Sequence, residues 1–201
     1  MKIDTVIFDI GNVLVNWNPD NLYRKIFPVE EERVQFLSTI CTMEWHTLQD
    51  AGRSPQEGTT ELLEKFPQHK EAILAFYDRW EEMFDGAIEG TVEILKEVKE
   101  KGYRVYALSN YNAELYQRTV NDFPFLEWFD GKIISSEAKM KKPDENIYRL
   151  LFERFFIDPK RAVFIDDLAA NIAAASQLGL NGILFTNPET LRQELQTRNI
   201  I

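Results

Sequence analysis

Several side chains that could do chemistry stand at the ends of apolar stretches in this sequence. Each stretch is short and rich in β-branched or aromatic residues, which is typical of a strand buried on both faces. Because the carboxyl ends of parallel strands meet at one edge of an α/β sheet, polar residues directly after them are expected to lie together. Those residues are Asp9 after the first stretch, Ser109 and Asn110 after the second, and Asp166 and Asp167 after the third.

Three of these side chains are carboxylic acids, and carboxylates crowded at one site repel each other and take up protons unless a cation is present. Mg²⁺ is the cation that suits hard oxygen ligands and keeps open positions for water and phosphate. Lys142 lies in a Lys-Lys-Pro sequence after the strand-like residues 132–135, so it is expected to reach the same edge and neutralise an anionic substrate. The sequence therefore predicts a magnesium site beside an anion-binding lysine.

The elements that must position these residues alternate between strands and helices over most of the chain. Apolar runs predict strands at residues 3–8, 104–109, 132–135, 162–165 and 181–185. Apolar residues at helical spacing predict helices at about 92–101, 113–123, 144–151 and 168–178, and from 188 onward. Such repeated strand–helix units imply an α/β fold, with a Rossmann-like parallel sheet flanked by helices on both faces.

Residues 16–88 interrupt this alternation. Their apolar residues follow helical spacing only, and they predict four amphipathic helices broken at Pro28, at residues 52–55 and at Pro67. The joints at residues 16–20 and 85–90 are expected to be loops. The expected organisation is an α/β core domain of residues 1–15 and 89–201, with residues 16–88 inserted after the first strand as an all-helical cap domain that opens and closes on the core.

Composition narrows the possible partners and compartments. The chain has 201 residues and a net charge of −10, a field that repels nucleic acid and anionic membranes. Strand-like sequence begins at Ile3, which leaves no room for a signal peptide, and the one cysteine, Cys41, has no partner for an internal disulfide. A cytoplasmic protein that binds neither nucleic acid nor membrane is expected. The sequence predicts no oligomeric state.

The order of the polar residues resembles that of the haloacid-dehalogenase-like (HAD) hydrolases, and of the phosphatases among them, over nearly the whole chain. Asp9 matches the first motif, Ser109-Asn110 the second, Lys142 the third and Asp166-Asp167 the fourth, and the helical insertion resembles the mobile cap. The first motif reads Asp-Ile-Gly-Asn-Val at residues 9–13. It is most similar to the motif of the glucose-1-phosphatase-like phosphatases.

This resemblance implies a nucleophile and a set of metal ligands. Asp9 would attack phosphorus and become an aspartyl-phosphate, while Lys142 would balance charge between Asp9 and the phosphate. Mg²⁺ would be held by Asp9, by the backbone carbonyl of Gly11 and by Asp167, with Asp166 in support.

The resemblance also implies how the substrate is bound. Ser109 and the backbone amides of Gly11 and Asn12 would hold the phosphate oxygens, with Asn110 and Lys142 beside them. The substrate would be a small phosphorylated metabolite, and within this subgroup a sugar phosphate is expected.

One position departs from the wider family pattern. Most HAD phosphatases carry a second Asp two residues after the nucleophile, which serves as general acid and base, but this chain has Gly11 there. General acid–base help contributes roughly 10²–10⁴-fold to a rate. Either water or a residue of the insertion must supply it, or the leaving group needs little protonation; His46 and Asp50 are possible substitutes.

Two other functions stay open at this stage. A 2-haloacid dehalogenase of the same superfamily also lacks the second Asp, but it uses no metal and does not need the Asp166-Asp167 pair. A non-catalytic binding protein on this fold would explain Gly11, although it would have no need for the full set of charged residues. A Mg²⁺-dependent phosphatase is therefore the leading prediction.

Overall fold

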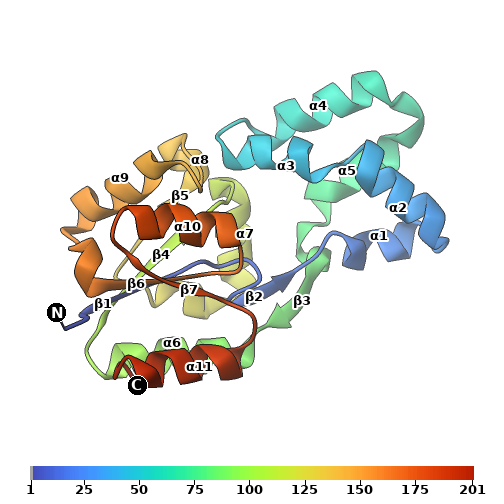
Figure 1. The fold of residues 1–201 in the computed structure, drawn as a ribbon. Helices are drawn as coiled ribbons and strands as arrows, with labels where there is room; N and C mark the ends of the chain where they lie inside the picture. Colours follow the sequence, from blue (N-terminus) through green and yellow to red (C-terminus); the bar gives the residue numbers. More distant parts are fainter. Residues whose placement is uncertain (1) are drawn as a thin grey trace.

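The computed structural model describes residues 2–201, and a five-stranded parallel sheet lies at its centre (Figure 1). The strands are β1 (Thr5–Phe8), β4 (Arg104–Ser109), β5 (Gly131–Ile134), β6 (Ala162–Asp166) and β7 (Asn181–Leu184), in the spatial order β5-β4-β1-β6-β7. Phe8 pairs with both Ala107 and Ile165, so Asp9 follows β1 at the level where its neighbours β4 and β6 also end. The predicted α/β fold and parallel sheet are confirmed.

Helices cover both faces of the sheet. Side chains of successive strand residues point to opposite faces, so the apolar strand residues form a cluster on each side. Val6 and Phe8 belong to one apolar cluster and Ile7 to the other. The first cluster includes side chains of α6 (Glu89–Glu100), α7 (Ala113–Asp122) and α11 (Pro188–Thr197), and the second those of α9 (Glu145–Phe155) and α10 (Ala169–Gln177). A single turn, α8 (Ser135–Ala138), directly follows β5.

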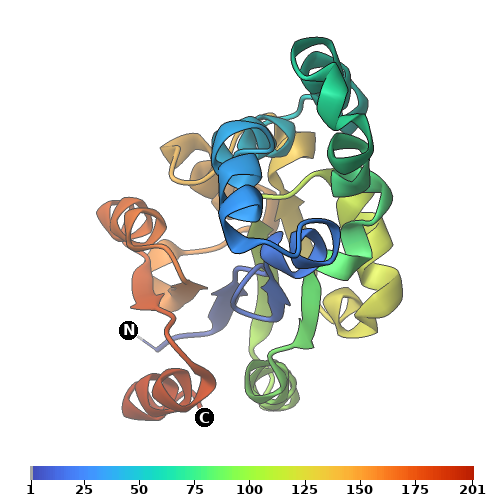
Figure 2. The same ribbon diagram turned by 90° about the vertical axis from the view of Figure 1, so that its right-hand side faces the viewer.

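The insertion after the first strand is helical, as predicted, but it has five α-helices rather than four. They are α1 (Asp20–Ile26), α2 (Glu30–Thr39), α3 (Met43–Asp50), α4 (Pro55–Lys65) and α5 (Lys70–Asp78). The missed break lies before α3, where the Thr42 hydroxyl accepts a hydrogen bond from the Trp45 amide and starts a new helix. In Figure 2 the insertion lies in front of the carboxyl ends of the strands.

The two joints between insertion and sheet contain strands, so the prediction of loops is wrong for residues 16–17 and 85–87, whereas residues 18–19 and 88 are in neither helix nor strand. β2 (Val15–Trp17) pairs antiparallel with β3 (Phe84–Ala87) and forms a separate two-stranded ribbon (Figure 1). The strands are short and contain Asn16, Asp85 and Gly86, residue types that are depleted in strands. The division into a core domain and a cap of residues 16–88 stays a proposal. Within residues 2–201, no helix combines the length and the apolar character that a bilayer crossing demands.

Candidate active site

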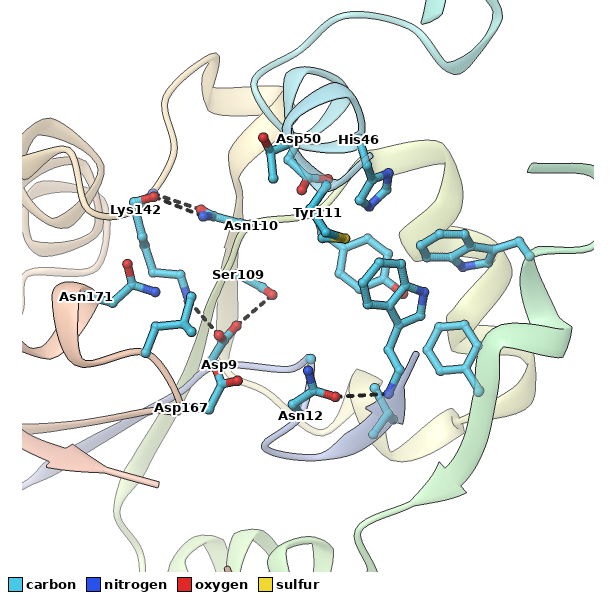
Figure 3. A pocket seen from close by; sticks show the side chains of 18 residues that line it. Asp9, Asn12, His46, Asp50, Ser109, Asn110, Tyr111, Lys142, Asp167 and Asn171 are labelled. Carbon is cyan, nitrogen blue, oxygen red and sulfur yellow. Dashed lines mark hydrogen bonds and ion pairs between the residues drawn. The ribbon is translucent and has the colours of Figure 1, made fainter. Parts of the chain in front are cut away.

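Asp9 lies directly after β1, and its carboxylate is held from two neighbouring elements (Figure 3). Oδ1 accepts hydrogen bonds from the Ser109 hydroxyl at 2.8 Å and from the Ile10 amide at 2.7 Å. Oδ2 lies 2.8 Å from Nζ of Lys142. Residues that are 100 and more positions apart in the chain thus meet at the carboxyl edge of the sheet, as the strand pattern predicts.

Lys142 is buried and bridges two carboxylates. Its Nζ lies 2.8 Å from Asp9 and 2.6 Å from Asp166, and its side chain is 1% exposed. The Asn110 side chain makes two hydrogen bonds to the backbone of Lys142. Its Nδ2 donates to the Lys142 carbonyl at 3.0 Å, and its Oδ1 accepts from the Lys142 backbone amide at 2.8 Å. Asn110 therefore positions Lys142, and its predicted contact with substrate stays a prediction.

The two acids that end the β6 region differ in their surroundings. Asp166 is fully buried and accepts from Lys142, from the Leu168 amide at 2.8 Å and from the Asn171 side chain at 2.9 and 3.1 Å. Asp167 instead lines the cavity above Asp9. Because Asp166 already has three donors, Asp167 is the acid with oxygen lone pairs free to face a ligand.

The charges of this cluster suit a divalent cation. One oxygen each from Asp9, Asp166 and Asp167 lies within 4.8 Å of the others, and with Lys142 the four side chains carry a formal charge of −2. Burial raises the pKa of Asp9 to about 7, an effect that Lys142 opposes and Asp166 reinforces. Burial and the neighbouring Asp166 also raise the pKa of Asp167. A hard cation with oxygen ligands would favour the charged carboxylates, so this donor set fits Mg²⁺.

The surrounding carboxylates raise the pKa of Lys142. Burial by itself lowers the pKa of an ammonium, but the nearby Asp9 and Asp166 outweigh it and leave the pKa of Lys142 above its ordinary value. Lys142 is therefore a permanent positive charge beside Asp9.

Asn171 is expected to affect metal binding through Asp166. It is buried on α10, and replacing it with Ala removes both side-chain hydrogen bonds to that carboxylate. Loss of such a supporting contact weakens metal affinity by about 10- to 100-fold. Titration of Mg²⁺ against the Asn171→Ala variant, with the exposed Asn146→Ala as the control, measures the change. An unchanged affinity would contradict a metal site next to Asp166.

The turn after Asp9 places the remaining predicted residues. Asn12 has a positive φ of 55°, and its backbone amide donates to the Val15 carbonyl at 2.8 Å while its side-chain oxygen accepts from the Trp17 amide at 3.1 Å. Its amide is thus engaged within the turn, and phosphate binding by Asn12 stays a prediction. Gly11 faces open space, with no atom within 4 Å of where a Cβ would lie.

A cavity of about 270 Å³ lies between this cluster and the helical insertion. The insertion side of its wall is mainly aromatic or apolar, and Trp17 stacks on His46 with 5.2 Å between ring centroids. Trp17 and Trp80 line the cavity and also pack against each other. No sequence pattern indicates that they line a cavity. The wall also contains Val15, Met43, Thr47, Phe84 and Tyr111.

Two residues singled out in the sequence, His46 and Asp50, reach this cavity from α3 (Figure 3). Arg53 and Trp45 do not line it. Arg53 pairs with Glu61, and the Trp45 indole donates to the Gly58 carbonyl at 3.0 Å, so both hold the insertion together.

Comparison with known proteins agrees with this arrangement. A sesquiterpene phosphatase of Aspergillus oryzae is 25% identical over 193 residues, 94% of this chain and 93% of its own. A phosphatase of phosphorylated carbohydrates from Thermotoga maritima is 26% identical over 90% of this chain and 84% of its own.

A solved structure of a HAD family enzyme from Bacteroides thetaiotaomicron, in complex with magnesium and inorganic phosphate, has a TM-score of 0.69 at 25% identity. The match covers 92% of this chain and 95% of that one. The model of the haloacid dehalogenase-like hydrolases matches residues 3–179. Since this match spans most of the chain, including the three polar strand ends and Lys142, the protein belongs to the haloacid dehalogenase-like hydrolase family.

Proposed function

We propose that this hydrolase is a Mg²⁺-dependent phosphatase that removes phosphate from a small metabolite through an aspartyl-phosphate on Asp9. The observation that carries the proposal is the surroundings of Asp9. Ser109 and Lys142 hold its carboxylate at the base of a cavity, and two further carboxylates stand within 4.8 Å. A nucleophile next to a positive charge and a cation site is what phosphoryl transfer requires.

Each residue has a defined part in this reaction. Asp9 attacks phosphorus, Ser109 fixes Asp9 and binds a phosphate oxygen, and Lys142 balances the charges of the carboxylate and the phosphate. Asp9, Asp167 and the carbonyl of Gly11 would hold Mg²⁺, with Asp166 in support. When bound, Mg²⁺ supplies positive charge that offsets the repulsion between the phosphate and the carboxylates.

The proposed substrate is a sugar phosphate, in keeping with the resemblance of the first motif to the glucose-1-phosphatase-like phosphatases. The cavity of about 270 Å³ suits a leaving group of this size. Its aromatic wall of Trp17 and Trp80 offers ring faces on which the C–H face of a sugar can stack. The carbohydrate-phosphate phosphatase among the relatives supports this choice.

Dehalogenation is the competing reaction, and the acidic cluster argues against it. A halide-displacing enzyme without a metal would hold the buried Asp166 and the half-buried Asp167 beside Asp9, with a single lysine to balance three carboxylates. Buried like charges are costly unless they are paired. A non-catalytic protein would carry the same cost without a use for it.

Release of inorganic phosphate from a panel of sugar phosphates tests the function. In Mg²⁺ the protein is expected to hydrolyse at least one of them, and EDTA is expected to lower the rate by about 100-fold or more until excess Mg²⁺ restores it. The same preparation incubated with 2-haloacids should release no halide. Metal-independent halide release, without phosphate release, would replace this proposal by dehalogenation.

A further inference from the structure

Release of an alkoxide or phenoxide from phosphorus is aided by a proton at the leaving oxygen, and the side chains around Asp9 have none to give. The Ser109 hydroxyl already donates to Asp9, and the Lys142 ammonium lies between two carboxylates. Gly11 has no side chain. A proton donor must therefore come from another part of the cavity wall.

Apart from the acidic cluster and Lys142, three titratable side chains among the described residues line the cavity, and two of them are unsuited to this task. Burial lowers the pKa of His46 to about 3, so the imidazole is neutral at pH 7, and its Nδ1 lies 3.2 Å from the Tyr77 hydroxyl. Burial raises the pKa of Tyr111, whose hydroxyl is hydrogen-bonded to Thr119 at 2.7 Å. The third side chain is Asp50.

Asp50 is buried and faces the cavity without a polar partner. The residue is 6% exposed, and within residues 2–201 no side chain or amide donates a hydrogen bond to its carboxylate or forms an ion pair with it. A buried carboxyl group without a hydrogen-bond partner or countercharge costs free energy. Ionisable groups in such surroundings are concentrated at functional sites. In Figure 3 Asp50 and His46 lie on the far side of the cavity from Asp9 and Asp167.

Contacts between the insertion and the sheet fix the position of Asp50. It is the last residue of α3, and its backbone carbonyl accepts a hydrogen bond of 2.6 Å from the Ser135 hydroxyl at the end of β5. Gly52, with a φ of 110°, comes so close to the core that an added Cβ would lie 3.2 Å from the Ser136 carbonyl. Asp50 is thus held over the strand ends by the closed arrangement of the two parts.

The electrostatic surroundings of Asp50 favour its protonated form near neutral pH. Burial raises its pKa to about 7, an effect that Lys141 opposes and the charge of Asp9 reinforces. Its other titratable neighbours, Tyr77 and Tyr111, have pKa values raised by burial and are uncharged at this pH. A carboxyl group whose pKa is near the working pH is suited to act as an acid in one step and as a base in the next.

We propose that Asp50, carried by the helical insertion, is the general acid and base of the phosphatase reaction. The inference rests on the proposed function. As an oxygen of Asp9 bonds to phosphorus, the bond to the leaving oxygen breaks, and that oxygen takes the proton of Asp50. In the second step Asp50 accepts a proton from the water that attacks phosphorus. The bond between phosphorus and Asp9 then breaks, and both carboxyl groups return to their starting states.

The dependence of kcat/KM on the leaving group tests this role in Asp50→Asn. Aryl phosphates suit the aromatic wall and differ in how much their leaving oxygen needs a proton: p-nitrophenyl phosphate needs little, whereas phenyl and p-methoxyphenyl phosphate need more. For p-nitrophenyl phosphate we expect kcat/KM within about threefold of wild type, which also shows that the variant is folded. For the other two we expect a loss of about 100-fold or more.

Two further variants and a pH profile sharpen the test. Glu44→Gln changes an exposed acid on the same helix and should behave as wild type with every substrate. Gly11→Asp, added to Asp50→Asn, places an acid where the structure has open space and should recover activity toward phenyl phosphate. In wild type, kcat/KM for phenyl phosphate should fall above about pH 7, where Asp50 loses its proton, and this limb should be absent for p-nitrophenyl phosphate.

The outcomes separate this inference from the proposed function. A loss in Asp50→Asn that is equal for all three phosphates would mean that Asp50 only positions the substrate, and no loss would mean that it has no part. Either result overturns the inference but leaves the proposed phosphatase function standing. A wild type that hydrolyses none of the phosphates overturns both.

Discussion

Replacing Asp9 with Asn is expected to lower kcat for phosphate release by at least about 10⁴-fold, because it removes the proposed nucleophile and not a supporting contact. The Asn side chain has nearly the same shape and can still accept a hydrogen bond from Ser109. Loss of activity therefore would not reflect a collapsed site. Steady-state phosphate release, together with an acid quench that traps phosphate on the protein, measures the effect, and the variant should carry no covalent phosphate.

The same substitution at the other end of β1 is the matched control. Asp4 stands just before this strand and pairs with Arg104 and Arg161 on the surface, so Asp4→Asn should keep the rate of wild type. Rapid hydrolysis or covalent phosphate in Asp9→Asn would show that another group attacks phosphorus. The acidic cluster would then need a different explanation.

How far the site can be predicted from sequence depends on which part of it is meant. The strand ends are predictable, because β1, β4 and β6 are apolar runs whose next residues are polar, and parallel pairing brings those residues to one edge. Asp9 and Ser109 meet for this reason. The same reasoning identifies the acids after β6, although only the structure shows that Asp166 is saturated with donors while Asp167 faces the cavity.

The opposite wall of the cavity could not be predicted from the sequence. The place of Asp50 depends on the bond between its carbonyl and Ser135, which lies 85 residues away, and on how closely Gly52 approaches the core. No periodic pattern encodes such contacts. Likewise no sequence pattern assigns Trp17 or Trp80 to a ligand site, and only the pairing of the short strands β2 and β3 brings Trp17 to the cavity. In the proposed reaction the sheet would supply the nucleophile, and the insertion would supply the surface that faces the leaving group.

Asp50 should also affect stability, with a sign that follows from its pKa. A carboxyl whose pKa is about 7 when folded and 3.8 when unfolded binds protons more tightly in the native state, so its contribution to stability is full below pH 3.8 and is lost as the pH rises through 7. At pH 8 wild type has a buried, unpaired charge that Asp50→Asn lacks. The difference in unfolding free energy between wild type and Asp50→Asn, measured by denaturant unfolding at pH 8 and again below pH 7, tests this sign.

Replacing Lys142 with Met is expected to lower both activity and stability. The side chain is 1% exposed, and its removal leaves Asp9 and Asp166 buried without a countercharge. Removing one partner of a buried ion pair costs about 3–5 kcal/mol in the free energy of unfolding. Phosphate release should fall by about 10²–10³-fold, since the charge beside the nucleophile is lost. Denaturant unfolding at pH 8 without metal, and kcat/KM in saturating Mg²⁺, measure the two effects separately.

Two further variants show whether the charge of Lys142 is what matters. Lys141→Met removes the neighbouring, half-buried lysine and should change stability by less than about 0.5 kcal/mol. Adding Asp166→Asn to Lys142→Met removes one of the unpaired carboxylates, so the double variant should be more stable than Lys142→Met alone by about 1–2 kcal/mol. It should not regain activity, because in the proposed reaction the lysine balances the phosphate as well as the carboxylates. A stable Lys142→Met, or a double variant less stable than the single one, would mean that packing and not charge keeps this lysine buried.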